Sequence, residues 1–242
     1  MTRLKVTAFQ NGYNGGKEAN GTWQKIINEI RPHDVFISGC LGHCAVTRLM
    51  KHSDIMYGID INKHVINSWE EMNWNWINLI NGDILEELPK LLEAYLPDRK
   101  VCLYVDPTYL MESIRSNVKP YPYTMDEEWH VKFLGLMNQL NGCENLDILV
   151  NHYPSQLYLE ELEGWRKIDY MTNTRQGMAE EWLFCNFNHT TGELHDYRWL
   201  GDNKDERYNL KNRMAKNLIK KLGNMDNRKM QAILYYMREL LN

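Results

Sequence analysis

The stretch Val101-Cys102-Leu103-Tyr104-Val105-Asp106-Pro107-Thr108-Tyr109 joins five apolar residues to a carboxylate, a proline and an aromatic ring. A short apolar run that ends at a turn-forming residue predicts a strand buried on both faces of a sheet. An Asp-Pro pair by itself more often opens an ordinary turn than a reactive site. The stretch therefore predicts a central strand, and the function of its last four residues depends on what the rest of the chain places beside them.

Similar apolar runs recur along the chain, with helical patterns between them. The runs are residues 34–37, 56–59 and 146–150, and the helical patterns are residues 23–30, 45–51, 63–73, 84–95 and 127–140. Strands that alternate with helices are typical of βαβ crossovers, which build a largely parallel sheet with helices on both faces. Residues 180–187 predict a late strand that runs antiparallel to the others. We expect a doubly wound, Rossmann-like α/β fold.

The composition is that of a globular protein. A chain of 242 residues with 43% hydrophobic content is long enough to bury the core of one sizeable domain. No run of about 18 apolar residues predicts a membrane span, and the first residues lead into no apolar core of signal-peptide length. We expect a cytoplasmic protein without a membrane partner. The five cysteines form no Cys-x-x-Cys pair, which favours reduced, partly buried thiols.

The charge is unevenly distributed along the chain. Residues 198–242 hold eleven Lys and Arg against five Asp and Glu, a balance of +6, and the net charge of −4 therefore leaves −10 for residues 1–197. We expect a main domain at 1–197 and a basic helical C-terminal appendage at 198–242. A basic helical face either contacts phosphates or is simply solvated, and the sequence leaves both open. The oligomeric state is open too, a homodimer included.

Glycine and acidic residues stand where the predicted strands end or the next helix begins. Gly39 and Gly42 follow the first strand, Asp60 follows the second, Asp83 precedes the helical pattern at 84–95, and Asp106 follows the strand at 101–105. In doubly wound sheets, ligands bind outside the carboxyl ends of the strands. We expect these groups to face one crevice.

Asp106, Pro107 and Tyr109 suit the exocyclic amine of a nucleobase. The lone pair of such an amine is delocalised into the ring, so the amine is a poor nucleophile, and its pKa is too high for simple deprotonation. The Asp106 carboxylate and the Pro107 carbonyl can each accept one N–H bond, which aims the nitrogen lone pair at a methyl donor. Tyr109 can stack on the face of the base.

The order of these segments resembles a known family. Tyr13-Asn14-Gly15-Gly16-Lys17 looks like an aromatic-x-Gly-Gly-Lys motif, and Asp60, Asp83 and Asp106-Pro107-Thr108-Tyr109 follow with short spacers. Over residues 13–187 the chain is similar to the Dam-like DNA adenine-N6 methyltransferases of bacteria and phages. The resemblance implies a class I methyltransferase sheet, S-adenosylmethionine (S-adenosyl-L-methionine) as cofactor, DNA as partner and N6 of a flipped adenine as the methyl acceptor.

The resemblance also implies roles for individual residues. For the cofactor these are Tyr13, Lys17, Gly39, Gly42, Asp60, Asp83 and Asp106, and for catalysis Asp106, Pro107 and Tyr109. Lys17 would pair with the methionine carboxylate of the cofactor, against which Tyr13 would pack. Asp60 would accept the ribose hydroxyl bonds and Asp83 would accept from the cofactor adenine. Asp60 has a rival role as a helix cap, a role that Asn62 or Asn67 could take instead.

Two segments depart from the family pattern. Cys40-Leu41-Gly42-His43-Cys44 stands where the family has Phe-x-Gly-x-Gly, so only Gly42 matches, and Gly39 is expected to supply the flexibility. Thr108 replaces a proline and restores a backbone N–H. Cys40, His43 and Cys44 suggest a zinc site, but no fourth ligand follows at a suitable spacing, so we expect no metal.

Later segments continue the resemblance in the family's order. Tyr121-Pro122-Tyr123-Thr124-Met125 and His130 resemble the loop and helix that follow the catalytic tetrapeptide, and such loops can close over a flipped base. Asn151-His152-Tyr153-Pro154-Ser155, Arg175 and Glu181-Trp182-Leu183 complete the resemblance. Local packing is the alternative role of these aromatic residues.

The spacer before Asp106 bears on sequence specificity. Relatives that read a short DNA sequence often carry a recognition domain there, but only 22 residues, 84–105, separate Asp83 from Asp106. Low sequence specificity is our hypothesis. Three alternatives remain open: RNA adenine or the cytosine N4 amine as acceptor, a catalytically idle nucleic-acid-binding relative, and a structural assembly protein, against which the intact cofactor motifs argue.

Overall fold

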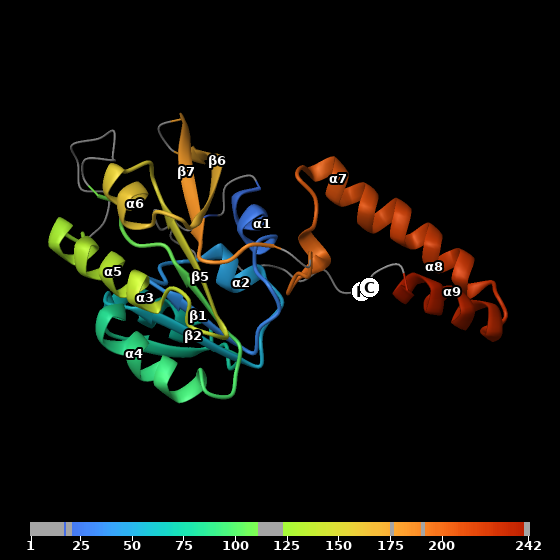
Figure 1. The fold of residues 1–242 in the computed structure, drawn as a ribbon, viewed down its shortest axis with the longest axis horizontal. Helices are drawn as coiled ribbons and strands as arrows, with labels where there is room; N and C mark the ends of the chain where they lie inside the picture. The colour runs from blue at the N-terminus through green and yellow to red at the C-terminus, as the bar shows by residue number, and fades with distance from the viewer. Residues whose placement is uncertain (1–16, 18–20, 111–122, 175–176, 190–191, 240–242) are drawn as a thin grey trace. The chain divides into compact units, whose positions relative to one another are not determined.

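The computed structural model describes residue 17 and residues 21–110, 123–174, 177–189 and 192–239 (Figure 1). The chain divides into two compact units, Met1–Asp196 and Tyr197–Asn242. Across the described ranges, no helix combines the length and the apolar character that crossing a membrane requires.

The first unit is built on one seven-stranded sheet. Its strands are β1 (Val35–Gly39), β2 (Ile55–Asp60), β3 (Asn78–Asn81), β4 (Val101–Val105), β5 (Leu146–His152), β6 (Arg166–Thr174) and β7 (Gly177–Cys185). Their order is β3-β2-β1-β4-β5-β7-β6. The first five strands are parallel, and β7 runs antiparallel to both β5 and β6. The predicted late antiparallel strand is confirmed.

Six helices of the described chain accompany this sheet. They are α1 (Thr22–Ile27), α2 (Ala45–Leu49), α3 (Lys63–Glu70), α4 (Ile84–Tyr95), α5 (Glu127–Leu140) and α6 (Gln156–Glu161). Helix α5 packs between α4 and α6 on one face of the sheet, while α1 packs against α2 (Figure 1). Every residue of β1 and β4 is buried, because helices cover both faces of the central strands. The predicted doubly wound, Rossmann-like α/β fold is confirmed.

The second unit is helical, as predicted for the C-terminal part of the chain. It consists of a 3-10 turn, η2 (Tyr197–Trp199), then α7 (Lys204–Tyr208), a π-helical turn η3 (Asn209–Met214), α8 (Ala215–Gly223) and α9 (Asn227–Glu239). In Figure 1, α7 and α8 lie along one rod. Among the described side chains of this unit none is buried, and Gly201 is its single buried residue. The helices therefore form without a core of their own.

Candidate functional site

A pocket opens at the carboxyl ends of the parallel strands, where the chain order reverses between β1 and β4. Ligands of doubly wound folds bind at such a switch point. The described residues that line the pocket are Cys40, Leu41, Gly42, Ile59, Asp60, Ile61, Asn62, Gly82, Asp83, Ile84, Asp106, Pro107, Thr108, Tyr123, Thr124, Met125, Asp126 and Trp129. The structure thus brings five predicted site residues to one wall: Gly42, Asp60, Asp83, Asp106 and Pro107.

The loop after β1 makes its turn at Cys40 and Gly42, which both have left-handed backbone angles (φ 54° and 46°). Gly39 belongs to the strand, so the expectation that it supplies the flexibility of this loop was wrong. Gly39 is required for space instead: a Cβ at this position would lie 2.0 Å from the Ile84 Cδ1 atom, at the start of α4. The close approach of β1 and α4 explains this glycine.

Asp60, the last residue of β2, fixes the loop opposite it. One carboxylate oxygen accepts a hydrogen bond from the Gly42 backbone N–H (2.8 Å), and the other accepts from the Asn62 N–H (2.8 Å). Asn62, not Asp60, is the N-cap of α3, since its side chain accepts from the His64 N–H. The rival role of Asp60 as a cap is thereby removed. Burial raises the pKa of the Asp60 carboxyl, although the two N–H bonds oppose this.

Asp83 lies on the same wall and does cap a helix. Its carboxylate accepts from the Leu85 N–H at the start of α4 (3.0 Å) and from the Trp129 indole N–H (3.1 Å). Trp129, on α5, stacks on Phe133 with ring centroids 5.2 Å apart and lines the pocket. Our sequence reading missed Trp129, although its place in the first turn of a helix after Asp126 indicated that it lies near the strand ends.

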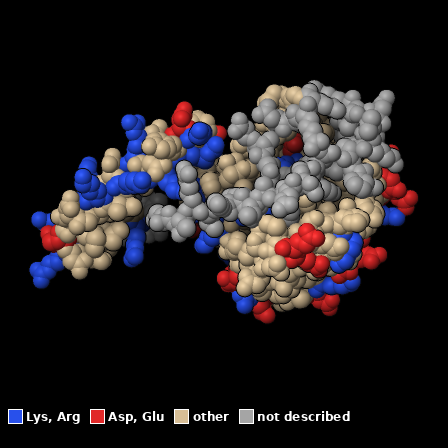
Figure 2. All heavy atoms as spheres, turned by 180° about the vertical axis from the view of Figure 1, so that it is seen from behind, with Lys and Arg blue, Asp and Glu red and all other residues tan. Residues whose placement is uncertain are grey.

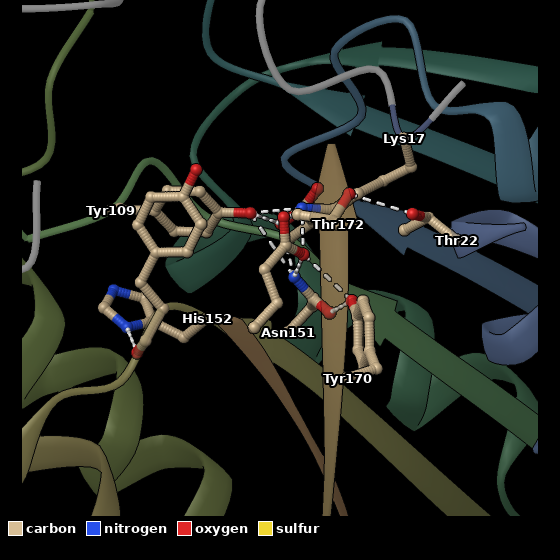
Figure 3. A network of polar contacts seen from close by, with 10 residues as sticks. Lys17, Thr22, Tyr109, Asn151, His152, Tyr170 and Thr172 are labelled. Atoms are coloured by element: carbon tan, nitrogen blue, oxygen red, sulfur yellow. Dashed lines mark hydrogen bonds and ion pairs between the residues drawn. The ribbon is translucent and has the colours of Figure 1, made fainter. Parts of the chain in front are cut away.

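Asp106 lies at the boundary between this pocket and a buried polar network (Figure 3). The Lys17 ammonium lies 3.1 Å from one Asp106 carboxylate oxygen and 2.8 Å from a Glu181 carboxylate oxygen. It also donates a short hydrogen bond to the Tyr109 hydroxyl, which in turn donates to Asp106 (3.3 Å). One lysine therefore links the strand-end carboxylate to a second carboxylate on β7.

Asn151 and Tyr170 complete the network from β5 and β6. The Asn151 side-chain amide donates to Glu181 (2.9 Å) and to Asp106 (3.3 Å). The Tyr170 hydroxyl donates to Glu181 (2.9 Å) and also bonds the Asn151 carbonyl oxygen. Figure 3 shows Lys17, Tyr109, Asn151 and Tyr170 converging on one point. Asn151 and Glu181 lie in two segments of the sequence resemblance, which assigned them no individual role, whereas Tyr170 was not predicted.

Burial and charge pull the pKa values of this network in opposite directions. Burial raises the pKa of Asp106 to about 6, with Lys17 opposing the rise and Glu181 adding to it. Burial alone would lower the pKa of Lys17, but the Asp106 and Glu181 carboxylates hold it well above its ordinary value. Burial would likewise raise the pKa of Glu181, yet Lys17 lowers it. Lys17 and Glu181 form a charged pair, and Asp106 is the member that titrates near neutrality.

Two predicted site residues lie in this network rather than on the pocket wall. Lys17, expected to reach the methionine carboxylate of a cofactor, is buried between two carboxylates of the protein. Tyr109 is 4% exposed, and its ring packs against Tyr153 with centroids 4.0 Å apart. In this structure the Tyr109 ring therefore packs, tilted by 31°, against a side chain of the protein.

Thr108 and His130 have structural roles in the described chain. The Thr108 hydroxyl accepts a hydrogen bond from the Met125 N–H (2.9 Å), so the residue that replaces the family's proline holds the segment before α5. His130 is fully buried, bonds the Tyr158 hydroxyl through its Nδ1 atom (2.8 Å) and has a pKa lowered by burial to about 4.

Some predicted positions lie outside the described residues. They are Tyr13, Tyr121, Pro122 and Arg175. Within the residues that are described, no group of three His, Cys, Asp or Glu side chains is arranged to hold a metal ion.

No protein-family model matches the chain, and comparison with curated proteins also gives no match. Solved structures similar to the chain include an rRNA methylase from Streptococcus thermophilus (11% identity, 67% of this chain and 93% of that chain, TM-score 0.43). Others are a SAM-dependent methyltransferase from Agrobacterium tumefaciens (9%, 67% and 58%, TM-score 0.43) and an N-methyltransferase from Bradyrhizobium japonicum (13%, 65% and 88%, TM-score 0.43). Structural similarities this distant do not identify a substrate, so the substrate is inferred from the site.

Proposed function

We propose that the protein is an S-adenosylmethionine-dependent methyltransferase that methylates the exocyclic N6 amine of adenine in DNA. The observation that carries this proposal is the single pocket onto which Asp60, Asp83, Asp106 and Pro107 all open. The adenine would be flipped out of its stack to reach Asp106-Pro107-Thr108-Tyr109.

The charge of the pocket supports this cofactor over a phosphate-bearing one. The described wall holds four carboxylates, at Asp60, Asp83, Asp106 and Asp126, and neither Lys nor Arg. Nucleotide phosphates bind to glycine-rich loops and cations, whereas a sulfonium is cationic and is attracted to carboxylates. When bound, S-adenosylmethionine supplies an activated methyl group on a positively charged sulfur.

The positions of two carboxylates fit the nucleoside half of the cofactor. Asp60 ends β2 and lines the pocket, and each of its oxygens accepts one backbone N–H, so each oxygen retains capacity to accept a bond from a ribose hydroxyl. Asp83 ends the next loop and would accept from the cofactor adenine. Trp129, which bonds Asp83, adds an aromatic surface to this part of the wall.

At the acceptor end, Asp106 and Pro107 would each accept one N–H of the target amine. The ionised carboxylate accepts an N–H bond more strongly than the protonated acid does, and the Asp106 pKa of about 6 keeps it mostly ionised at neutral pH. Lys17 and Glu181 act as positioning residues, since they hold the Asp106 carboxylate without lining the pocket. Tyr109 would stack on the base only after its ring leaves Tyr153.

The choice of adenine and of DNA rests on the resemblance of the motifs to the Dam-like family. Labelled methyl transfer tests it: unmethylated duplex DNA, single-stranded DNA and RNA are offered in parallel, and the modified base is identified by mass spectrometry. We expect N6-methyladenine in DNA, with Asp106→Ala as the inactive blank. Methylated RNA or a cytosine product would overturn the acceptor assignment.

Calorimetry separates the enzyme from a catalytically idle relative. We expect S-adenosylmethionine to bind the wild-type protein and to bind Asp60→Ala on the order of tenfold more weakly, because a charged hydrogen-bond partner is lost. Asp54→Ala, which changes an exposed carboxylate outside the pocket, is the matched control. No binding to the wild-type protein, with or without DNA, would contradict the enzymatic assignment.

A further inference from the structure

The helices of the second unit, Tyr197–Asn242, separate apolar from basic residues. On α8, Leu218, Ile219 and Leu222 share one side of the helix. Lys216, Lys220 and Lys221 occupy the remaining side, and all three are exposed. None of these three lysines has an ion-pair partner among the residues that the structure describes. Their charge is therefore available to an external ligand.

The same pattern continues on α9. Arg228 and Lys229 are exposed in its first turn, and Lys229 lies 3.4 Å from Asp226. Tyr235 and Tyr236 are 59% and 66% exposed further along this helix. Exposed aromatic rings among cations are a combination that nucleic-acid-binding surfaces use, with phosphates held by the cations and bases or sugars contacting the rings.

The charge balance favours a polyanion as the partner of this unit. The unit carries +6, while the rest of the chain carries −10. Figure 2 shows Lys and Arg side chains along the helical unit, with few acidic ones among them. A second copy of the unit would bring like charges together, which disfavours self-association.

The pocket itself cannot supply cations for a nucleic-acid backbone. Its described wall is acidic, and Lys17 is buried between Asp106 and Glu181. A nucleic acid that delivers a base to this wall would meet repulsion from the carboxylates unless cations elsewhere held its phosphates.

We propose that residues 197–239 bind the backbone phosphates of the nucleic-acid substrate, with Lys216, Lys220 and Lys221 on α8 as principal contacts and α9 contributing Arg228. These basic side chains would bind nucleic acid independently of its base sequence, because phosphate contacts carry no direct sequence information. This inference rests on the proposed function only in supposing a nucleic-acid substrate.

The test measures binding of a labelled 30-base-pair duplex to the full chain across a range of salt concentrations. The K216Q/K220Q/K221Q variant keeps residues of high helix propensity and removes three charges. Each lost phosphate contact lowers the slope of log K against log salt by about 0.9, so three contacts predict a fall of about 2.7, together with an affinity loss on the order of tenfold or more at physiological salt. Circular dichroism checks that the helices persist.

The matched control is K63Q/K90Q/K132Q, which removes three exposed lysines of the first unit that each face a glutamate. We expect this control to bind DNA with nearly the wild-type slope. Equal losses in the two triple variants would overturn the inference, and so would unchanged binding by K216Q/K220Q/K221Q. Sedimentation that shows a dimer dependent on Leu218 and Ile219, with DNA binding unaffected by the lysines, would assign the unit to self-association and also overturn it.

This test is separable from that of the proposed function. Binding is measured without cofactor and without turnover, so its outcome does not depend on methyl transfer. Salt-dependent binding without any methyl transfer would overturn the proposed function and leave this inference standing.

Discussion

The buried Lys17 ammonium lies between the carboxylates of Asp106 and Glu181, and both charges act on the pKa of Asp106. Burial and Glu181 raise the pKa of Asp106 to about 6, while Lys17 limits the rise. A carboxylate accepts an N–H bond more strongly when it is ionised than when it is protonated. The proposed reaction therefore has an acid limit set by this one carboxyl group.

We predict that the single-turnover rate of methyl transfer falls about tenfold for each pH unit below about 6. Glu181→Gln removes a neighbouring negative charge, so it lowers the pKa of Asp106 and moves the acid limb to lower pH. Glu180→Gln, the adjacent exposed residue on β7, is the control and should keep the wild-type profile. An acid limb that stays in place in Glu181→Gln would contradict the role given to the network.

The network also makes Lys17 important for stability. Its side chain is 3% exposed, so removing the ammonium leaves two buried carboxylates without a compensating charge. We expect Lys17→Met to lower the free energy of unfolding by about 3–5 kcal/mol, as measured by urea denaturation, and Lys17→Met with Glu181→Gln to recover a large part of this loss. Lys63→Met, at an exposed pair with Glu70, should change stability by about 0.5 kcal/mol or less. A loss in Lys17→Met no larger than in Lys63→Met would refute this account.

At the level of the elements, close packing of β1 against α4 explains the glycine at the end of β1. We predict that Gly39→Ala destabilises the fold by about 1–3 kcal/mol, since its Cβ would meet the buried Ile84 side chain. The double variant Gly39→Ala with Ile84→Val should be less destabilised than the sum of the two single changes. Thermal unfolding measures all three proteins.

Gly135 on α5 provides the matched glycine. A Cβ there would meet nothing within 4 Å, so Gly135→Ala should stabilise the protein by about 0.5–1 kcal/mol through helix propensity alone. If both alanines had the same effect, the space argument at Gly39 would fail.

The strands and helices that the sequence predicted are those with a clear apolar pattern. Helices α4 and α5 have the predicted bounds, the strands β2, β4 and β5 contain the predicted apolar runs, and β1 begins one residue after the start of the run predicted at 34–37. Strands β3 and β6 were missed because both pair with one neighbour only and carry exposed polar residues, as in the sequence Asn78-Leu79-Ile80-Asn81. The periodicity of apolar residues does not by itself predict such edge strands.

The site residues divide in the same way, into those that a local sequence pattern locates and those that only the folded chain brings together. Asp60, Asp83 and Asp106 could be placed on one pocket, because each follows a predicted strand or begins a predicted helix. The partners of Lys17 could not be predicted from the sequence. Glu181 lies 164 positions away along the chain, and only the folded sheet brings Lys17 and Glu181 together. The reading of Lys17 as a cofactor ligand came from local sequence, which carries no information on that pairing.

For the whole molecule, the connection before Asp106 bears on the proposed choice of target. The structure fills residues 84–105 with α4, a short turn and β4, so no recognition domain is inserted there. We predict that sequencing of methylated DNA finds modified adenines in many contexts with at most a short consensus. A strict multi-base motif would contradict low specificity.

The pair formed by Lys17 and Glu181 has one more consequence, which concerns the order of assembly. The pocket wall comes from residues 40–129, whereas the groups that hold Asp106 come from residue 17 and from strands β5, β6 and β7. Contacts between residues so far apart in the sequence form late in folding, because closing the long loop between them costs conformational entropy. Cofactor affinity and turnover should therefore recover at different times during refolding, and turnover reports when the last two strands have joined the sheet.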